Sequence, residues 1–258
     1  MRCCRVCLLY VFMAGTAVGQ SRPASDPQAL SYAARSIAAM SGGMNITDMS
    51  LTGSVTWNSG ADTGTATLTA LGTTDSRMDL VLSSGTRTEI RDAQNGMPVG
   101  QWINPDNSSG PFAPQNCQTD AVWFFPALGS LAAGTNVVLL NVGQTTWNGT
   151  IVQHLQSYIY QPNLPSAITP SGRQLSTMDF YLDATSFLPV AVTFKVHPDS
   201  DINRDLLTEV DFSNYQNFAS VNFPTHIQRY QQGALMVDVT VTEASVNTGL
   251  PSSSFTLN

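Results

Sequence analysis

The densest group of potential metal ligands in the sequence is an acidic run at residues 199–205. Oxygen-bearing side chains occupy every second position of this run: Asp199, Asp201, Asn203 and Asp205. This alternation is typical of a calcium-binding loop, which also needs a glycine at its sixth position and a glutamate at its twelfth. Arg204 and Val210 stand at those two positions here. A polar loop between two strands explains the run without a metal, so we expect no metal site, and calcium binding is the alternative.

The other polar residues form no catalytic motif. The three histidines, His154, His197 and His226, lack the short spacing of metal ligands. The sequence has no nucleophile-elbow serine, zinc-protease motif, phosphate-binding loop or Cys-x-x-Cys pair. Asp179 and Asp183 could be proposed as a hydrolytic pair, but they flank a predicted turn and are better explained as structural. We therefore predict that the protein is not an enzyme and uses no cofactor, with a hydrolase as the third alternative.

Three charged residues, Arg87, Glu89 and Arg91, recur at every second position and therefore share one face of a predicted strand. Charges placed in this way commonly pair with charges on the neighbouring strands. We interpret the three residues as a cross-strand charge ladder rather than as a site.

The N-terminus has the layout of a secretory signal peptide at residues 1–19. Arg2 and Arg5 precede an apolar run at residues 6–14, and Ala17-Val18-Gly19 forms a cleavage site of small residues. The apolar run is too short to cross a bilayer, so we expect no membrane anchor and a periplasmic or secreted protein. The mature protein, residues 20–258, is then one domain. Cleavage removes three of the four cysteines and leaves Cys117, which excludes an internal disulfide.

Composition limits the partners of this domain. Only 11% of the 258 residues are charged, and the net charge of −7 becomes −9 once Arg2 and Arg5 are removed. A chain this acidic repels phosphate backbones and anionic membrane surfaces. We therefore expect no nucleic-acid partner, and we expect a monomer.

Hydrophobic periodicity predicts a mainly β protein. Asp26-Pro27 can begin a helix that ends at Gly42-Gly43, and from residue 52 onward the apolar residues alternate, as in strands. About ten to eleven short antiparallel strands follow, with tight turns between them. Residues 104–118 and 161–173 are predicted loops. Between them, Thr119 can cap a second helix at residues 120–133, which is apolar nearly all round and therefore expected to be buried.

Several stretches resemble the LolA/LolB-type family of bacterial lipoprotein carriers, whose relatives include RseB-type envelope sensors. They are MDFYLDATSFLPV at 178–190, DFSNYQNFASVNFPTHI at 211–227, QQGAL at 231–235 and VNTGLPSSSF at 246–255. Ser220 stands where a glycine is common in the family's turn. The resemblance implies a strongly curved antiparallel half-barrel, with an N-terminal helix and a helical plug on its concave side.

This resemblance also implies a concave apolar cavity, and an apolar sheet face covered by the 120–133 segment supports that independently. The function it favours is a non-enzymatic periplasmic carrier or receptor for an acyl chain, a lipid or a lipoprotein. An envelope sensor that binds another protein is the alternative, and an ordinary filled core is the structural alternative to a cavity. The candidate ligand-binding residues are Met78, Leu80, Leu82, Trp123, Phe124, Phe125, Leu128, Leu131, Phe180, Val192 and Phe194.

Overall fold

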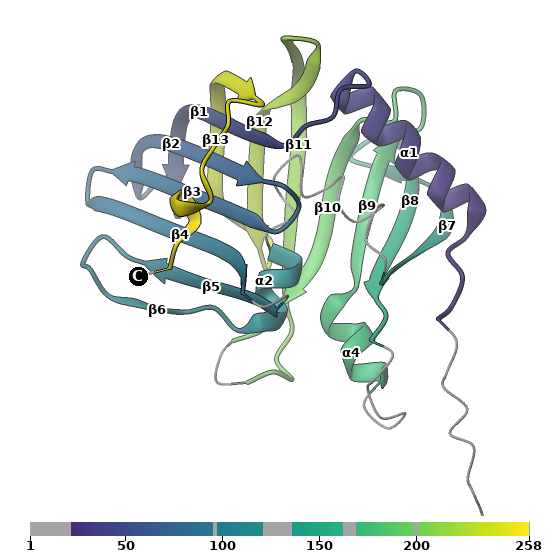
Figure 1. Cartoon of the computed structure of the whole chain (residues 1–258), viewed down its shortest axis with the longest axis horizontal. Coiled ribbons are helices and arrows are strands. Elements are labelled where there is room, and N and C mark those ends of the chain that lie inside the picture. The colour runs from purple at the N-terminus through teal and green to yellow at the C-terminus, as the bar shows by residue number, and fades with distance from the viewer. Residues whose placement is uncertain (1–21, 95–96, 121–135, 162–168, 199–200, 258) are drawn as a thin grey trace, which may run out of the picture.

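The computed structural model describes residues 22–94, 97–120, 136–161, 169–198 and 201–257. Within these ranges the protein consists of one sheet and a few short helices (Figure 1). The strands are β1 (Asp48–Trp57), β2 (Asp62–Leu71), β3 (Asp75–Leu82), β4 (Gly85–Gln94), β5 (Met97–Ile103), β6 (Ser109–Pro111), β7 (Val137–Trp147), β8 (Thr150–Ile159), β9 (Met178–Asp183), β10 (Pro189–Val196), β11 (Leu206–Phe218), β12 (Val221–Gln231) and β13 (Ala234–Val246). The helices are α1 (Pro27–Ser41), α2 (Pro114–Asp120), α4 (Thr169–Ser176) and the 3₁₀ turn η2 (Ser252–Phe255). Nowhere in these ranges is a helix both long and apolar enough to cross a bilayer.

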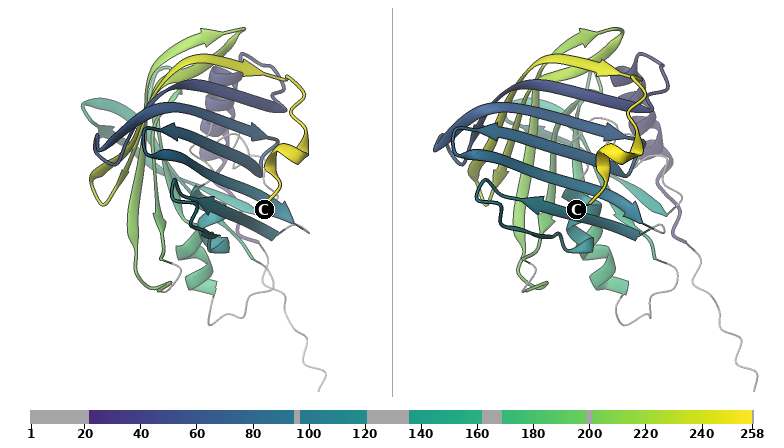
Figure 2. Two further views of the ribbon diagram at one scale, coloured as in Figure 1. Left: turned by 90° about the vertical axis from the view of Figure 1, so that its left-hand side faces the viewer. Right: turned by 60° about the vertical axis from the view of Figure 1, so that its left-hand side comes forward.

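Two antiparallel meanders make up the sheet, and the pairing of β1 with β13 joins them. The strand order is β6-β5-β4-β3-β2-β1-β13-β12-β11-β10-β9-β8-β7. Apart from β1 and β13, any two strands that are adjacent in the sheet are also consecutive in the chain. All the strand pairs are antiparallel, as short strands with tight turns predict. The sheet is open and strongly curved (Figure 2). Its two meanders, β1–β6 and β7–β13, form two wings that face each other across a concave side. The predicted mainly β class and N-terminal helix are confirmed.

The predicted number of strands, ten to eleven, is wrong, because the sheet has thirteen. The missed strands are β5 and β6, which carry Pro98, Gly100 and Pro111. Proline is tolerated where no further strand needs its N–H. Here β6 pairs only with Gln101–Ile103, so Pro98 lies in a part of β5 that has no outer neighbour in the sheet order. A strand at the edge of the sheet can therefore contain prolines and glycines, which count against a strand when the sequence alone is used for prediction.

Alternation places one side of each strand in the core. In β3, Met78, Leu80 and Leu82 are buried on the concave side, while Val81 on the other side is 55% exposed. The main core cluster continues through the buried apolar residues of β1, β2 and β9–β13. Ala29 and Met40 of α1 belong to the same cluster, so this helix covers part of the concave face.

The helix α1 has the caps that its sequence predicts. The carboxylate of Asp26 accepts hydrogen bonds from the backbone N–H groups of Gln28 and Ala29, at 2.7 and 3.1 Å. At the other end, Gly42 takes the left-handed conformation with φ of 59°. The amide of Asn222 on β12 donates to the carbonyl of Ala39 at 2.7 Å and holds this end of the helix on the sheet.

Replacing Gly42 by alanine is expected to destabilise the protein by about 1–3 kcal/mol. A Cβ there would lie 2.3 Å from the carbonyl oxygen of Ser220 and would also be strained by the positive φ. Gly43→Ala is the matched control, because Gly43 also has a positive φ but no atom within 4 Å of such a Cβ. Urea denaturation measures both variants. Equal losses would show that the close approach to Ser220 contributes nothing.

Thr119 lies within a helix instead of capping one that follows it. The helix α2 (Pro114–Asp120) overlaps the end of the predicted loop 104–118, and the hydroxyl of Thr119 donates to the carbonyl of Gln115 within the helix. Pro114 opens α2, where its missing N–H is not needed. Another helix, α4, occupies the end of the predicted loop 161–173. The predicted plug at 120–133 lies outside the described residues from position 121 onward, as does the signal peptide.

Candidate functional site

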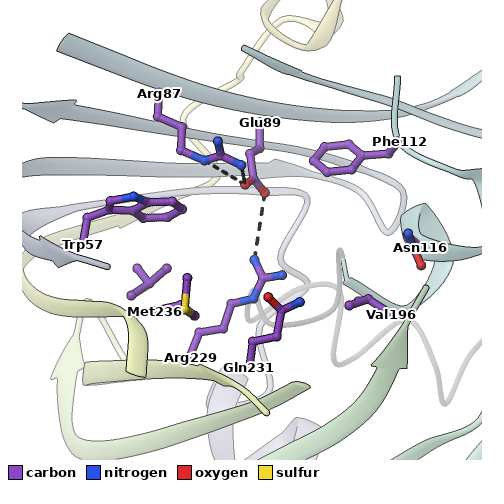
Figure 3. Close-up of a pocket in the computed structure, with 10 residues that line it drawn as sticks. Trp57, Arg87, Glu89, Phe112, Asn116, Val196, Arg229, Gln231 and Met236 are labelled. Atoms are coloured by element: carbon purple, nitrogen blue, oxygen red, sulfur yellow. Dashed lines mark hydrogen bonds and ion pairs between the residues drawn. The ribbon is translucent and has the colours of Figure 1, made fainter. Parts of the chain in front are cut away.

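A cavity of about 240 Å³ lies on the concave side, between the two wings of the sheet (Figure 3). Arg87 on β4 and Val196 on β10 both line it, although six strands separate β4 from β10 in the sheet order. The curvature of the sheet therefore creates this space. Its lining residues are Trp57, Arg87, Glu89, Phe112, Asn116, Val196, Arg229, Gln231, Met236 and Val237.

A second, more open space of about 370 Å³ adjoins the first. The two spaces share five lining residues, Arg87, Phe112, Asn116, Val196 and Gln231. The second space adds Trp102, Asn104, His197, Pro198 and Leu206. Together they form a continuous recess that leads from the protein surface to the inner cavity.

The polar centre of the recess is a buried carboxylate held by three guanidinium groups. Glu89 is 3% exposed, and its Oε1 lies 2.7 Å from Nη2 of Arg87. Its Oε2 lies 3.2 Å from Nη2 of Arg91 and 4.0 Å from Nη1 of Arg229. Arg229 reaches the carboxylate from β12, on the opposite wing (Figure 3). The four residues therefore tie the two wings together electrostatically.

The guanidinium groups decide the ionisation of Glu89. Burial alone would raise the pKa of this carboxyl group, because the interior solvates its charge poorly. The charges of Arg91, Arg229 and Arg87 outweigh burial and lower the pKa to about 2. Glu89 is consequently ionised throughout the physiological pH range.

The predicted cross-strand charge ladder is wrong. Glu89 stands opposite Met78 on β3 and Trp102 on β5, so its direct cross-strand neighbours carry no charge. Its partners are the residues two positions before and after it on the same strand, and Arg229 across the recess. The charged face of β4 points into the concave interior rather than to solvent.

Aromatic rings fix the orientation of two of these arginines. The guanidinium of Arg87 lies 4.8 Å from the ring centroid of Trp57, and that of Arg91 lies 4.5 Å from that of Phe112. Arg87 also donates a hydrogen bond to Oδ1 of Asn104. Cationic groups held in fixed positions beside apolar side chains are suited to bind an amphipathic molecule.

The helix α2 connects the two wings at the recess, because it contacts both β5 and β10. Asn116 is buried and grips the backbone that follows β10. Its Oδ1 accepts from the N–H of His197 at 2.9 Å, and its Nδ2 donates to the carbonyl of His197 at 2.7 Å. This pair of hydrogen bonds positions α2 over the recess.

Asn116→Ala is expected to lower the free energy of unfolding by about 2–3 kcal/mol, because it leaves two buried backbone groups of His197 without their partner. Gln115→Ala, at a half-buried position of the same helix, serves as the control and should cost little. Thermal and urea unfolding monitored by circular dichroism measure both. A loss below 0.5 kcal/mol for Asn116→Ala would contradict this role of the side chain.

Six of the predicted ligand-binding residues lie in the buried core cluster. They are Met78, Leu80, Leu82, Phe180, Val192 and Phe194, each 7% exposed or less. None of these six lines either of the two spaces described above. The other five, Trp123, Phe124, Phe125, Leu128 and Leu131, lie outside the described residues. Contact of these eleven residues with a ligand stays a prediction.

The residues that do line the recess include several that sequence reasoning missed, such as Trp57, Arg229 and Met236. The alternation of Arg87, Glu89 and Arg91 was a usable signal, because a strand with one apolar side rarely carries charges at consecutive positions of a single face. No pattern in the sequence connects this face to Arg229.

Two other histidines each contact an aspartate. His154 lies 2.7 Å from Asp179, and His226 lies 2.9 Å from Asp238. Asp183 accepts hydrogen bonds from the backbone of residues 185 and 186, as its predicted structural role at a turn requires. Among the described residues, no three His, Cys, Asp or Glu side chains gather as a metal site would require. In the acidic run, Asp205 pairs with Lys195 and His197.

No family model and no curated protein matches this sequence. Solved structures match it over most of its length. A Vibrio parahaemolyticus domain named for outer membrane lipoprotein sorting is 12% identical, with a TM-score of 0.54 over 88% of this chain and 96% of its own. A LolA superfamily protein from Nitrosomonas europaea is 11% identical, with a TM-score of 0.55 over 89% and 97%.

A DUF1329 family protein from Desulfovibrio piger is 9% identical, with a TM-score of 0.55 over 91% of this chain and 98% of its own. Identities this low show likeness of fold and nothing finer. The resemblance first seen in the short motifs of residues 178–255 is confirmed at the level of structure, and the chain has the LolA-like fold.

Proposed function

We propose that this protein is a non-enzymatic carrier or receptor that binds the acyl chain of a lipid or lipoprotein in the cell envelope. The observation that carries the proposal is the recess on the concave face, where Trp57, Val196, Met236 and Val237 offer apolar surface. The LolA-like fold supports it, since one protein of this fold is named for lipoprotein sorting. The predicted signal peptide supports a periplasmic or secreted location.

The size of the inner cavity suits one chain rather than a bulky ligand. A volume of about 240 Å³ corresponds to about eight groups the size of water, at ~30 Å³ each. Burying eight methylene groups contributes about 6 kcal/mol. A chain of this length therefore binds in the inner cavity, and a longer chain extends into the adjoining open space.

Binding rather than catalysis is the activity that this recess supports. A general acid or base works best with a pKa near the operating pH. Glu89, the carboxylate that lines the cavity, has a pKa of about 2 and is engaged by arginines at both oxygens. It is therefore suited to hold neighbouring charges in place and poorly suited to transfer protons.

Displacement of a fluorescent apolar probe tests this function. Phenylnaphthylamine should bind the purified protein saturably at one site, and single-chain amphiphiles of ten to sixteen carbons should displace it. The protein must be purified without detergent, because detergent would occupy the recess. If neither the probe nor any amphiphile binds saturably, the carrier proposal is wrong.

A further inference from the structure

We propose that Gln231 recognises the carbonyl group of an acyl amide or acyl ester, with about eight carbons of the chain lying beyond it in the inner cavity. This inference rests on the proposed function and specifies the linkage and the chain length of its ligand. It makes Gln231 a specificity-determining residue at the point where the inner cavity meets the open space.

Gln231 stands at the junction of the two spaces, because it lines both of them. Its backbone is fixed by strand pairing, with Thr208 of β11 on one side and Ala234 of β13 on the other. Its side chain extends into the recess beside Arg229, with Met236 to one side (Figure 3). A ligand that reaches from one space into the other therefore passes the amide of Gln231.

Among the residues at this junction, Gln231 is the one whose polar side chain is available to a ligand. The other residues shared by both spaces are Arg87, Phe112, Asn116 and Val196. Phe112 and Val196 are apolar, and Arg87 is bonded to two protein side chains. Both polar atoms of the Asn116 side chain are bonded to the backbone of the residue after β10. In the part of the chain that the structure describes, the side chain of Gln231 makes no hydrogen bond.

The charged groups deeper in the cavity are engaged by the protein itself. Glu89 is held by three guanidinium groups. Arg229 contacts Glu89 and makes a further interaction besides. These groups hold one another in place, so the recognition of a ligand's polar group is left to the neutral amide of Gln231.

The chemistry of this amide indicates what it recognises. A plain hydrocarbon chain would remove water from the half-buried amide of Gln231 and leave its N–H groups unsatisfied, which is unfavourable. A carbonyl oxygen at this point accepts a hydrogen bond from Nε2 and replaces that water. Beyond Gln231, the inner cavity is lined by the apolar side chains of Trp57, Met236 and Val237. The end of the chain therefore lies there, and the cavity volume of about 240 Å³ sets its length at about eight carbons.

Isomeric amides test the inference on the wild-type protein at constant composition. N-butyloctanamide, N-hexylhexanamide and N-methylundecanamide contain the same atoms and differ in where the amide stands along the chain. We expect N-butyloctanamide to displace phenylnaphthylamine at concentrations about fivefold lower than either isomer, because it fills the inner cavity and places its carbonyl at Gln231. Equal displacement by the three isomers would overturn the inference and leave the carrier function intact. Failure of the probe and of every amphiphile to bind would overturn both.

A single variant locates the contact. Gln231→Leu keeps the approximate size of the side chain and removes its amide. N-butyloctanamide should bind this variant about five- to tenfold more weakly, and its advantage over the two isomers should disappear. Gln216→Leu makes the same change at an exposed position of β11 outside the lining of both spaces, and should alter none of these affinities. An isomer preference that persists in Gln231→Leu would overturn the role of this residue.

An ester distinguishes the carbonyl from the rest of the amide. Butyl octanoate has the same carbonyl position as N-butyloctanamide and no N–H group. It should lose affinity for Gln231→Leu by a similar factor, whereas an ester that is unaffected would overturn the contact with the carbonyl. Because the comparison of isomers needs no variant, a variant that fails to fold does not block the test.

Discussion

Replacing Glu89 by glutamine is expected to lower the free energy of unfolding by about 3–5 kcal/mol, the largest stability loss we predict for a single substitution. The change keeps the shape of the side chain and removes one charge. Arg87, Arg91 and Arg229 then lose their shared counter-ion in a place where water reaches them poorly. Removing one partner from a buried ion cluster costs far more than losing a surface ion pair.

Urea denaturation followed by circular dichroism measures this loss. Glu243→Gln makes the same chemical change at an exposed position of β13 and should alter stability by no more than about 0.5 kcal/mol. If Glu89→Gln and Glu243→Gln behave alike, the cluster does not hold the two wings together.

Acid unfolding provides a second measurement of the same cluster. The pKa of Glu89 falls from an ordinary value near 4.5 to about 2 in the folded protein, so its ionised form stabilises the fold. That contribution is complete above pH 4.5 and is lost as the pH falls through the range toward 2. The Glu89→Gln variant should lack this part of the pH dependence. A stability profile below pH 4.5 that is identical in wild type and variant would contradict the lowered pKa.

Met236→Trp is expected to weaken binding of a dodecyl amphiphile by about 100-fold, the largest functional effect we predict. Met236 lines the inner cavity and is half-buried, so the larger indole has room to enter the space that the chain would occupy. A 100-fold loss corresponds to about 2.7 kcal/mol, so filling part of the cavity removes somewhat less than half of the ~6 kcal/mol that eight buried methylenes contribute.

The control is Leu235→Trp, which places the same ring at the preceding residue of β13, outside the lining of both spaces. Probe displacement and calorimetry should show near wild-type affinity for this variant. Retained binding in Met236→Trp, with a folded protein by circular dichroism, would place the ligand elsewhere.

Local patterns in the sequence predict much of this fold. The cap residue Asp26 and the terminating Gly42 fix α1, and period-two alternation fixes the buried face of strands such as β3. The turn between β11 and β12, at Ala219-Ser220, belongs to the 211–227 stretch that resembles the LolA/LolB-type family. It forms even though serine replaces the glycine common there, with φ values of 49° and 73° at the two positions. Strands β5 and β6 were not predictable in this way, because sheet edges relax the constraints from which strand patterns arise.

The candidate site was less predictable than the fold, because it depends on curvature. Local alternation shows that Arg87 and Glu89 share a face, but not that this face is concave. Arg229 meets them only because two separate meanders join at β1 and β13 and bend toward each other. Sequence reasoning placed the ligand among apolar residues of β3, β9 and β10, which the structure buries in the core, and of the 120–133 segment, whose candidate residues lie outside the described ranges. The recess instead lies where polar and apolar residues from both wings converge.

Native mass spectrometry tests the central claim most directly. The protein, purified without detergent, is mixed with a total lipid extract and transferred intact to the gas phase, alongside Met236→Trp. Binding in the recess predicts one adduct per protein, with the mass of a single lipid, on the wild-type protein and its loss from the variant. A wild-type spectrum that stays free of adducts, or an adduct that persists unchanged in Met236→Trp, would contradict binding of an acyl chain in the concave recess.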